Sequence, residues 1–169
     1  NFNEKGELIF LLGEVTNCIN ASEYLASIAG VDRSPAPHFN LEAEGKVQGC
    51  VRKAIDRGCI RAAHDVADGG LFVSLLEMAK PNGLGFDVVT DDDIRLDAFL
   101  FGEGQGRIVV SCEENQQDRL LDIIEEFDVP IVLLGHVTKG KIVVDNTHFG
   151  FCEEWRNTFD NALEEELMG

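Results

Sequence analysis

The chain has 169 residues, of which 44% are hydrophobic and 27% are charged, and 14 basic against 31 acidic residues give a formal net charge of −17 at pH 7. This composition excludes intrinsic disorder as the main state, because a chain of this size and hydrophobic content can bury a core. A strongly acidic field repels phosphodiester backbones, so we expect no nucleic-acid partner. The longest apolar runs, 8–12 and 131–134, are far shorter than the ~20 residues of a membrane span, so we expect no membrane partner either.

The cysteines and the first residues indicate which kinds of site and which domain organisation to expect. The five cysteines are odd in number and form no Cys-x-x-Cys pair, so neither a disulfide framework nor a zinc site is expected, and a reducing cytoplasm fits best. Each cysteine is interpreted as a small core residue. The start shows no secretory signal and no Met, which indicates a piece of a longer chain. We expect residues 1–169 to form a single domain, the last of that chain, with 1–14 either its first strand or a junction strand from a preceding domain.

In the first part of the chain, a strand is followed by two helices. The apolar run from Glu7 to Glu14 predicts a buried strand, and Ser22 is a plausible N-cap for a short helix that stops at Gly30. After a proline-rich connector, apolar residues at helical spacing predict a longer helix from Leu41 to Arg57, closed by Gly58.

From residue 60 onwards, strands and helices alternate. The predicted strands cover residues 60–66, 84–89, 107–112, 131–137 and 141–145. The predicted helices run from residue 71 to a stop at 81–83, and over 96–101, 115–127 and 150–167. Interleaved strands and helices, with a strand pair late in the chain, predict an α/β (α+β) sandwich built around a mixed sheet.

The segment most suggestive of chemistry runs from His64 to Leu71, where a strand ends in Asp65 and turns through Asp68, Gly69 and Gly70 into a helix. Backbone N–H groups at a helix start can hold an anion. A carboxylate beside them can hold Mg²⁺, which takes one or two protein oxygens and leaves its other positions to phosphates and water. The pattern therefore fits a nucleotide-phosphate corner. The alternative is a structural turn in which Asp68 caps the helix and the two glycines supply positive φ.

The second glycine-rich segment, Gly102 to Gly106, is similar to a dinucleotide-binding fingerprint but fails its test. The fingerprint requires glycine where the chain has Arg107, and the loop precedes a strand rather than a helix. Glu103, Gln105 and Arg107 could still contact a polar ligand, or the loop could simply pack beside the sheet. The histidines show no metal spacing and no Ser/His/Asp order can be singled out, so the sequence assigns no catalytic residue.

Together these segments resemble the C-terminal domain of the aminoimidazole ribonucleotide synthase-related superfamily, and within it most closely the phosphoribosylformylglycinamidine synthases of purine biosynthesis. The motifs that carry the resemblance occur in family order over nearly the whole chain: Leu12-Gly13-Glu14, Ser22-Glu23-Tyr24, Ala63 to Leu71 with Glu77-Met78-Ala79, Gly83-Leu84-Gly85, Phe101 to Arg107, and Leu134 to Val137. The resemblance implies a mixed sheet with helices and an ATP-dependent ligase. In that reaction ATP activates the amide oxygen of formylglycinamide ribonucleotide, and ammonia from glutamine displaces it.

The resemblance also implies roles for individual positions. Asp65 matches an aspartate that binds Mg²⁺ at an auxiliary nucleotide site, next to the expected phosphate-binding residues Asp68, Gly69 and Gly70. The segment Glu103-Gly104-Gln105 stands where the first of the family's two repeated halves has a substrate-contacting Glu-Ser-Gln loop. The implied cofactors are ATP or ADP and Mg²⁺. The implied partners are the N-terminal domains of the same chain and a glutaminase subunit or domain.

Two alternatives remain open on the residues alone. The domain could be a structural buttress that binds no nucleotide, or the equivalent domain of a superfamily relative with another substrate. In each case we expect the isolated chain to lack synthase activity, because the family's catalytic histidine and most of its ATP-binding residues lie in N-terminal domains.

Overall fold

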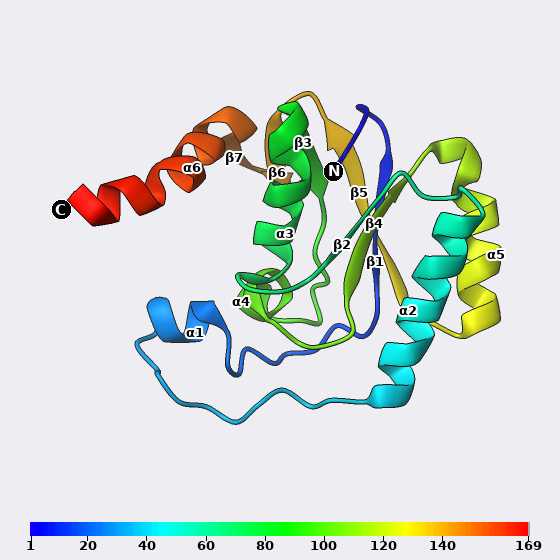
Figure 1. The fold of residues 1–169 in the computed structure, drawn as a ribbon, viewed down its shortest axis with the longest axis horizontal. Coiled ribbons are helices and arrows are strands. Elements are labelled where there is room, and N and C mark those ends of the chain that lie inside the picture. Colours follow the sequence, from blue (N-terminus) through cyan, green and yellow to red (C-terminus); the bar gives the residue numbers. More distant parts are fainter. Residues whose placement is uncertain (169) are drawn as a thin grey trace.

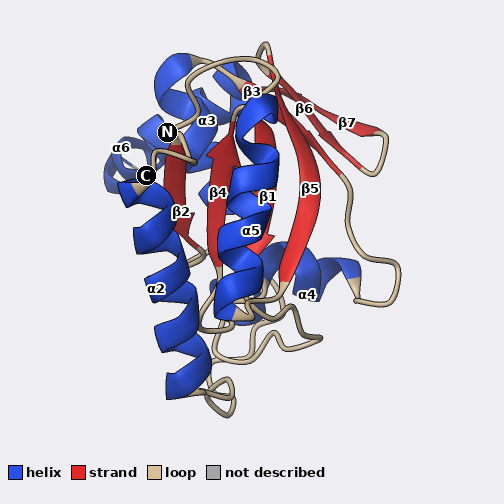
Figure 2. Cartoon of the chain, turned by 90° about the vertical axis from the view of Figure 1, so that its right-hand side faces the viewer, coloured by secondary structure: helices blue, strands red, loops and turns tan. Residues whose placement is uncertain are grey.

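The computed structural model describes residues 1–168, apart from the side chains of 163–166, and places helices on both faces of one mixed sheet (Figures 1 and 2). The strands are Leu8–Leu12 (β1), Ala62–Asp65 (β2), Gly85–Val88 (β3), Ile108–Cys112 (β4), Ile131–Thr138 (β5), Lys141–Val144 (β6) and Thr147–Phe151 (β7). The helices are Glu23–Ser27 (α1), Leu41–Asp56 (α2), Gly70–Ala79 (α3), Leu96–Phe101 (α4), Gln117–Phe127 (α5) and Cys152–Met168 (α6). Among these helices, none is both long and apolar enough to span a bilayer.

The sheet is mixed, as the sequence predicted. Its strand order is β2-β4-β1-β5-β3-β6-β7, in which β3 and β6 pair in parallel and every other pair is antiparallel. β1 lies between β4 and β5, near the middle of the sheet. The segment that the sequence left as a first strand or a junction strand thus carries hydrogen bonds to neighbours on both sides.

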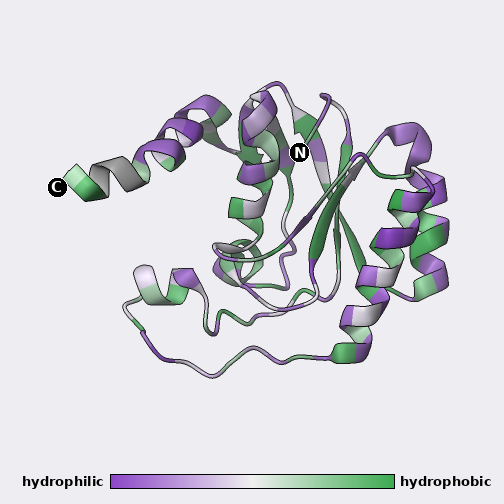
Figure 3. Ribbon diagram, in the orientation of Figure 1, coloured by the Kyte–Doolittle hydropathy of each residue, from purple (hydrophilic) through white to green (hydrophobic). Residues whose placement is uncertain are grey.

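The sheet has an apolar core on each face, which explains why β1 is a continuous apolar run rather than an alternating one. Ile9 and Leu11 belong to the core cluster under α3, whereas Phe10 and Leu12 belong to the cluster under α2 and α5. All four side chains are buried. Figure 3 shows the corresponding pattern, with hydrophobic strands inside and hydrophilic residues on the outer faces of the helices.

The end of the chain differs from the sequence prediction. Residues 147–151 form an additional strand, β7, and Gly150, which we expected in the last helix, lies in that strand with φ +87°. Asp145 and Asn146 both have positive φ, which is the backbone of a two-residue hairpin turn, and this turn returns the chain onto β6. The helix therefore begins at Cys152. The Asp-Asn pair was a hairpin signal that the sequence analysis did not use.

Four of the five cysteines lie in the core, as expected, whereas Cys18 does not. Cys50, Cys59, Cys112 and Cys152 are buried, Cys18 is partly exposed, and all five are free. Burial raises the pKa of Cys50 and of Cys112 to about 11, so both thiols stay protonated at neutral pH.

We predict that a thiol reagent labels Cys18 alone in the folded chain near neutral pH and all five after denaturation. Rapid labelling of two or more thiols in the folded chain would contradict this arrangement.

Gly13 connects the end of β1 to the loop at 102–106 by a close backbone approach. Its φ is +100°, and a Cβ there would overlap the carbonyl oxygen of Gly106.

We predict that Gly13→Ala lowers the free energy of unfolding by about 2–5 kcal/mol in urea titrations, through backbone strain and the clash. The control is Gly45→Ala in α2, which meets no atom within 4 Å and should raise stability by ~0.5–1 kcal/mol. Similar effects of the two changes would refute this packing.

Candidate functional site

The turn between β2 and α3 has a backbone that glycine adopts readily. Gly69 and Gly70 have φ of +83° and +72°, and a Cβ on Gly70 would lie 2.6 Å from the Cα of Phe101 at the end of α4. The glycines therefore let α3 start immediately after the turn and pack closely on α4. The alternative interpretation of this turn, in which Asp68 caps the helix, is wrong on that point: Gly69 is the N-cap residue of α3, and Asp68 is exposed.

Glu103, from the second glycine-rich loop, supplies the missing cap. Its Oε1 accepts a hydrogen bond from the backbone N–H of Gly69 at 2.9 Å and another from that of Glu23, in the first turn of α1, at 2.8 Å. A carboxylate is favourable there because helix N-termini present unpaired N–H groups and a positive dipole end. The N–H of Gly70 donates to the carbonyl of Ala67 at 2.9 Å. The turn and the loop, which the sequence analysis treated separately, thus form one site.

Arg107 holds the same loop from within. Its side chain is buried, and its Nη2 and Nε donate to the carbonyl oxygens of Gly102 and Gly104, the latter at 3.3 Å. Burial lowers the pKa of Arg107 to about 10, and the nearby Glu103 charge opposes that shift. The guanidinium therefore remains charged at neutral pH, with two of its donors engaged by its own loop.

The two loops and α2 border a cleft of about 370 Å³. Four carboxylates line it, together with two amide side chains and a single cation, Arg107; the acids are Glu44, Asp65, Asp68 and Glu103, and the amides are Gln48 and Gln105. The local excess of negative charge attracts a cation and repels a bare phosphate. No group of three or more His, Cys, Asp or Glu within the described residues is arranged to hold a metal ion unaided.

Asp65 presents an open carboxylate to this cleft. Its side chain is 77% exposed, and its backbone oxygen is fixed by Ser74 Oγ, which donates at 3.1 Å, and lies 2.7 Å from His64 Nδ1. Within the described part of the chain its carboxylate pairs with no Lys or Arg; His64 Nδ1 lies 3.8 Å from Oδ1. The ring of His64 also approaches Glu77, at 3.4 Å. Asp65 is therefore held by its backbone while its carboxylate stays available.

Glu44 is the residue of this cleft that sequence reasoning missed. It lies in the first turn of α2, where Gln48 Nε2 donates to its Oε1 at 2.7 Å. Its Oε2 is buried and has no hydrogen-bond partner among the described residues. A Cβ on Gly106 would lie 2.8 Å from Oε2, so this oxygen faces the 102–106 loop. No local pattern marked Glu44, because its environment exists only once α2 lies beside that loop.

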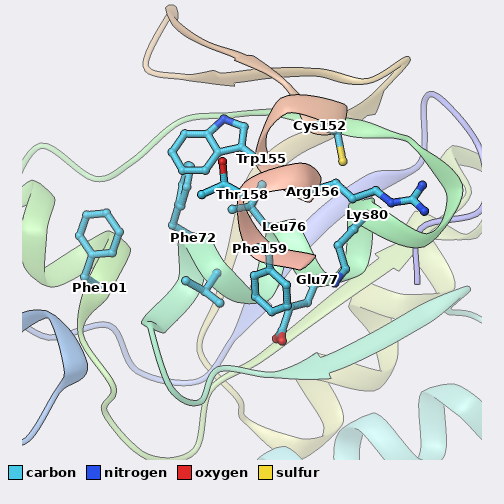
Figure 4. Close-up of a pocket in the computed structure, with 11 residues that line it drawn as sticks. Phe72, Leu76, Glu77, Lys80, Phe101, Cys152, Trp155, Arg156, Thr158 and Phe159 are labelled. Carbon is cyan, nitrogen blue, oxygen red and sulfur yellow. The ribbon is translucent and has the colours of Figure 1, made fainter. Parts of the chain in front are cut away.

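A second pocket, of about 320 Å³, lies between α3 and α6 and is mainly apolar (Figure 4). Phe72 of α3 packs at 5.3 Å, ring centre to ring centre, from Trp155 of α6. Lys80 Nζ lies 3.9 Å from the ring centre of Phe159 and 2.7 Å from a carboxylate oxygen of Asp160. The lysine of this pocket, Lys80, is therefore already paired with Asp160. The acidic cleft, with its open carboxylates, is the better candidate for chemistry.

Comparison with known proteins places this fold and cleft in a family. The family described as AIR synthase related protein, C-terminal domain, matches residues 4–146. The chain belongs to this family. The matched range contains every residue of the acidic cleft, whereas β7 and α6, which forms one wall of the apolar pocket, lie beyond it.

Curated relatives of this AIR synthase-related domain are much longer proteins. The chain is 40% identical over 143 residues to the phosphoribosylformylglycinamidine synthase subunit PurL of Moorella thermoacetica, covering 85% of this chain and 20% of the relative. It is 36% identical over 172 residues to PurL of Thermus thermophilus, covering 99% and 23%. The chain therefore spans roughly a fifth to a quarter of the length of these relatives.

Solved structures share the fold. A structure described as T. maritima PurL complexed with FGAR superposes with a TM-score of 0.75 at 17% identity, over 90% of this chain and 28% of that one. Other structures of the same fold are described as T. maritima PurL complexed with ATP and with ADP, and as PurLQS from Thermotoga maritima. At this identity the likeness establishes the domain architecture.

Glu103 provides a direct test of the capping arrangement. Glu103→Ala removes the acceptor for two backbone N–H groups, so we expect the free energy of unfolding to fall by about 1–3 kcal/mol in chemical denaturation. Glu103→Gln keeps an oxygen acceptor in the same place and should lose clearly less. An alanine variant as stable as the glutamine variant would argue against the capping role.

Proposed function

We propose that this chain is the C-terminal domain of a phosphoribosylformylglycinamidine synthase of the PurL type, and that its acidic cleft holds Mg²⁺ together with the phosphates of ATP or ADP. The whole protein would use ATP to activate the amide oxygen of formylglycinamide ribonucleotide, which ammonia then displaces to form formylglycinamidine ribonucleotide. The relatives named PurL, at 36–40% identity, support this assignment over a superfamily relative with another substrate. The T. maritima structures described with ATP, ADP and FGAR support the choice of ligands.

The observation that carries the site proposal is the carboxylate of Asp65. It stands at the end of β2, opens into the cleft and pairs with no Lys or Arg within residues 1–168. Strand ends followed by a helix start are common ligand sites in α/β folds, because backbone and side-chain groups converge there.

The residues of the cleft fit a magnesium ion. Mg²⁺ prefers carboxylate oxygens, takes one or two from protein, and completes its octahedron with water and phosphate. Asp65 supplies one such oxygen at the border of the cleft, and Asp68 carries a second exposed carboxylate there. When bound, the ion would neutralise phosphate charge that the carboxylates would otherwise repel.

The other positions of the proposed site belong to the two loops that border the cleft. Asp68 is exposed on its border, and the N–H of Gly69 is held by Glu103, so a phosphate would reach this N–H only after displacing that carboxylate. We therefore propose that the phosphates meet the Asp65 side of the turn Asp68-Gly69-Gly70 through the cation. Gln105, exposed at the cleft beside Glu103 and Gly104, remains our candidate for a polar contact with substrate.

The remaining machinery would come from outside this chain. We propose that preceding domains of a longer chain supply the catalytic residues, since none is assigned here, and that a glutaminase subunit or domain supplies the ammonia. The structure described as PurLQS supports a multi-subunit assembly. We also propose a cytoplasmic location, which the five free cysteines support because such thiols persist in reducing compartments.

A purely structural role is the second candidate, and one observation favours it. The N-terminus of α3 is already capped by Glu103, and Arg107 donates two hydrogen bonds to carbonyl oxygens of its own loop. A domain arranged in this way could support its neighbours without binding any nucleotide.

Calorimetry with ADP and Mg²⁺ separates these candidates. In the full-length protein that contains this domain, we expect Mg²⁺-ADP to bind at the cleft, and Asp65→Ala to weaken that binding by roughly tenfold or more, because the metal loses a carboxylate. Asp122→Ala, an exposed acid on α5, removes the same charge away from the cleft and should bind as the unchanged chain does. Absence of binding by the unchanged chain, or equal binding by Asp65→Ala, would support the structural role.

A further inference from the structure

The apolar pocket between α3 and α6 is one end of a longer groove. A second hollow, of about 640 Å³, adjoins it and is lined by residues of α1, α3, α4, β7 and α6. Phe72, Phe101 and Trp155 line both, so the two form one continuous surface that runs from α6 across α3 and α4 to α1. All three rings are labelled in Figure 4. We call the residues that line the pocket and this hollow the aromatic groove.

The centre of the aromatic groove is a set of packed rings. Phe72 lies 5.3 Å from Trp155, 6.0 Å from Phe101 and 6.3 Å from Phe149, ring centre to ring centre. Tyr24 of α1 stacks on Phe101 at 5.2 Å. Aromatic side chains supply large, rigid apolar contact areas and are enriched at the centres of protein interfaces. Because Phe149 remains 41% exposed, part of this apolar set faces solvent.

The cations that line the aromatic groove are paired within the chain. Lys80 and Arg156 both pair with Asp160, at 2.7 and 3.4 Å. Arg95 Nε donates to Asp97 at 3.1 Å. Among the described residues, the groove therefore offers no unpaired basic group to a phosphate or a carboxylate. An apolar protein surface fits it better than an anionic metabolite does.

Two helices that border the groove are poorly covered in this chain. No residue of α1 is buried, and Ile28, directly after it, is exposed. On α6, Trp155 is half-buried and Phe159 is exposed. In Figure 1 both helices project from the side of the molecule that carries α3 and α4. Short helices gain most of their stability from tertiary packing, so we expect the five-residue α1 to pack against a surface that this chain does not supply.

The length of the relatives indicates what supplies that surface. The chain covers only 20% and 23% of the two PurL relatives, so under the proposed function most of the polypeptide lies outside it. The alignment with PurL of Thermus thermophilus covers 99% of the chain and so includes β7 and nearly all of α6, which form one wall of the groove. Domains of one chain typically contact each other over about 600–1,500 Å². The aromatic groove offers a continuous apolar surface for such a contact.

We infer that the aromatic groove is the surface through which this domain docks onto a preceding domain of the same longer chain, with an apolar segment of that domain seated between α1 and α6. This inference rests on the proposed function, which supplies the longer chain. It gives a role to β7 and α6, which lie outside the family match. It also accounts for a short helix that has no buried residue of its own.

The test compares two positions that are almost equally exposed in this chain. Leu96 of α4 lines the aromatic groove and is 53% exposed, whereas Ile55 of α2, on the opposite face of the sheet, is 56% exposed and lies outside the groove. Leu96→Cys and Ile55→Cys are made separately in the full-length protein. Labelling of each introduced thiol by a maleimide is followed by mass spectrometry of the peptide that contains it, over a wide range of protein concentration.

We expect the thiol introduced at position 96 to react roughly tenfold or more slowly than the thiol introduced at position 55, because the docked domain covers it except during local opening. The difference should be the same at every protein concentration, since an intramolecular contact does not depend on concentration. Equal rates at the two positions would overturn the inference. Protection that disappears on dilution would identify a second copy as the occupant and would overturn it as well.

A second measurement separates this inference from the proposed function. The unchanged full-length protein is assayed for formylglycinamidine ribonucleotide, made from formylglycinamide ribonucleotide, ATP and an ammonium salt. If the product forms while position 96 is unprotected, the docking inference fails and the proposed function stands. If position 96 is protected and no product forms, the proposed synthase function fails and the docking surface stands. If neither is observed, both fail.

Discussion

The carboxylate of Glu103 joins the separate segments around the cleft. One of its oxygens accepts hydrogen bonds from the N–H groups of Gly69 at the start of α3 and of Glu23 at the start of α1. The bond fixes the glycine-rich loop against the β2–α3 turn, and it uses the N–H group that would otherwise attract an anion. The groups that remain exposed in the cleft are mostly carboxylate oxygens. The cleft therefore favours the binding of cations, and of anions that are bound together with a cation.

The sheet makes this contact possible. β2 and β4 pair antiparallel, so the end of β2 at Asp65 lies opposite the start of β4 at Ile108, directly after the glycine-rich loop. Gly13, at the end of β1, approaches the backbone of Gly106 more closely than any side chain would allow. The loop is thus held by the end of β1, by the internal donors of Arg107 and by the cap from Glu103. An acidic cleft needs such support, because its carboxylates repel one another.

The last two elements, β7 and α6, form an apolar region that is distinct from the acidic cleft. β7 and α6 lie beyond the range that matches the AIR synthase-related family, and α6 extends away from the sheet in Figure 1. The apolar pocket in Figure 4 exists because Trp155 and Phe159 of α6 face α3. Phe149 and Phe151 of β7 are also substantially exposed. The apolar pocket lies along α3, whereas the acidic cleft is lined by the turn that precedes α3 and by no residue of α3 itself.

Sequence pattern alone was sufficient for the local features of this protein. The apolar run of β1, the helical spacing of α2 and α5, and the glycines after Asp65 each follow from near neighbours along the chain, through periodicity and backbone freedom. Tertiary structure alone decided that Glu103 rather than Asp68 caps α3, and that one carboxylate oxygen of Glu44 is buried against the 102–106 loop. These contacts join residues that lie far apart in the sequence and that strand order and helix packing bring together. Local residue spacing therefore could not predict them.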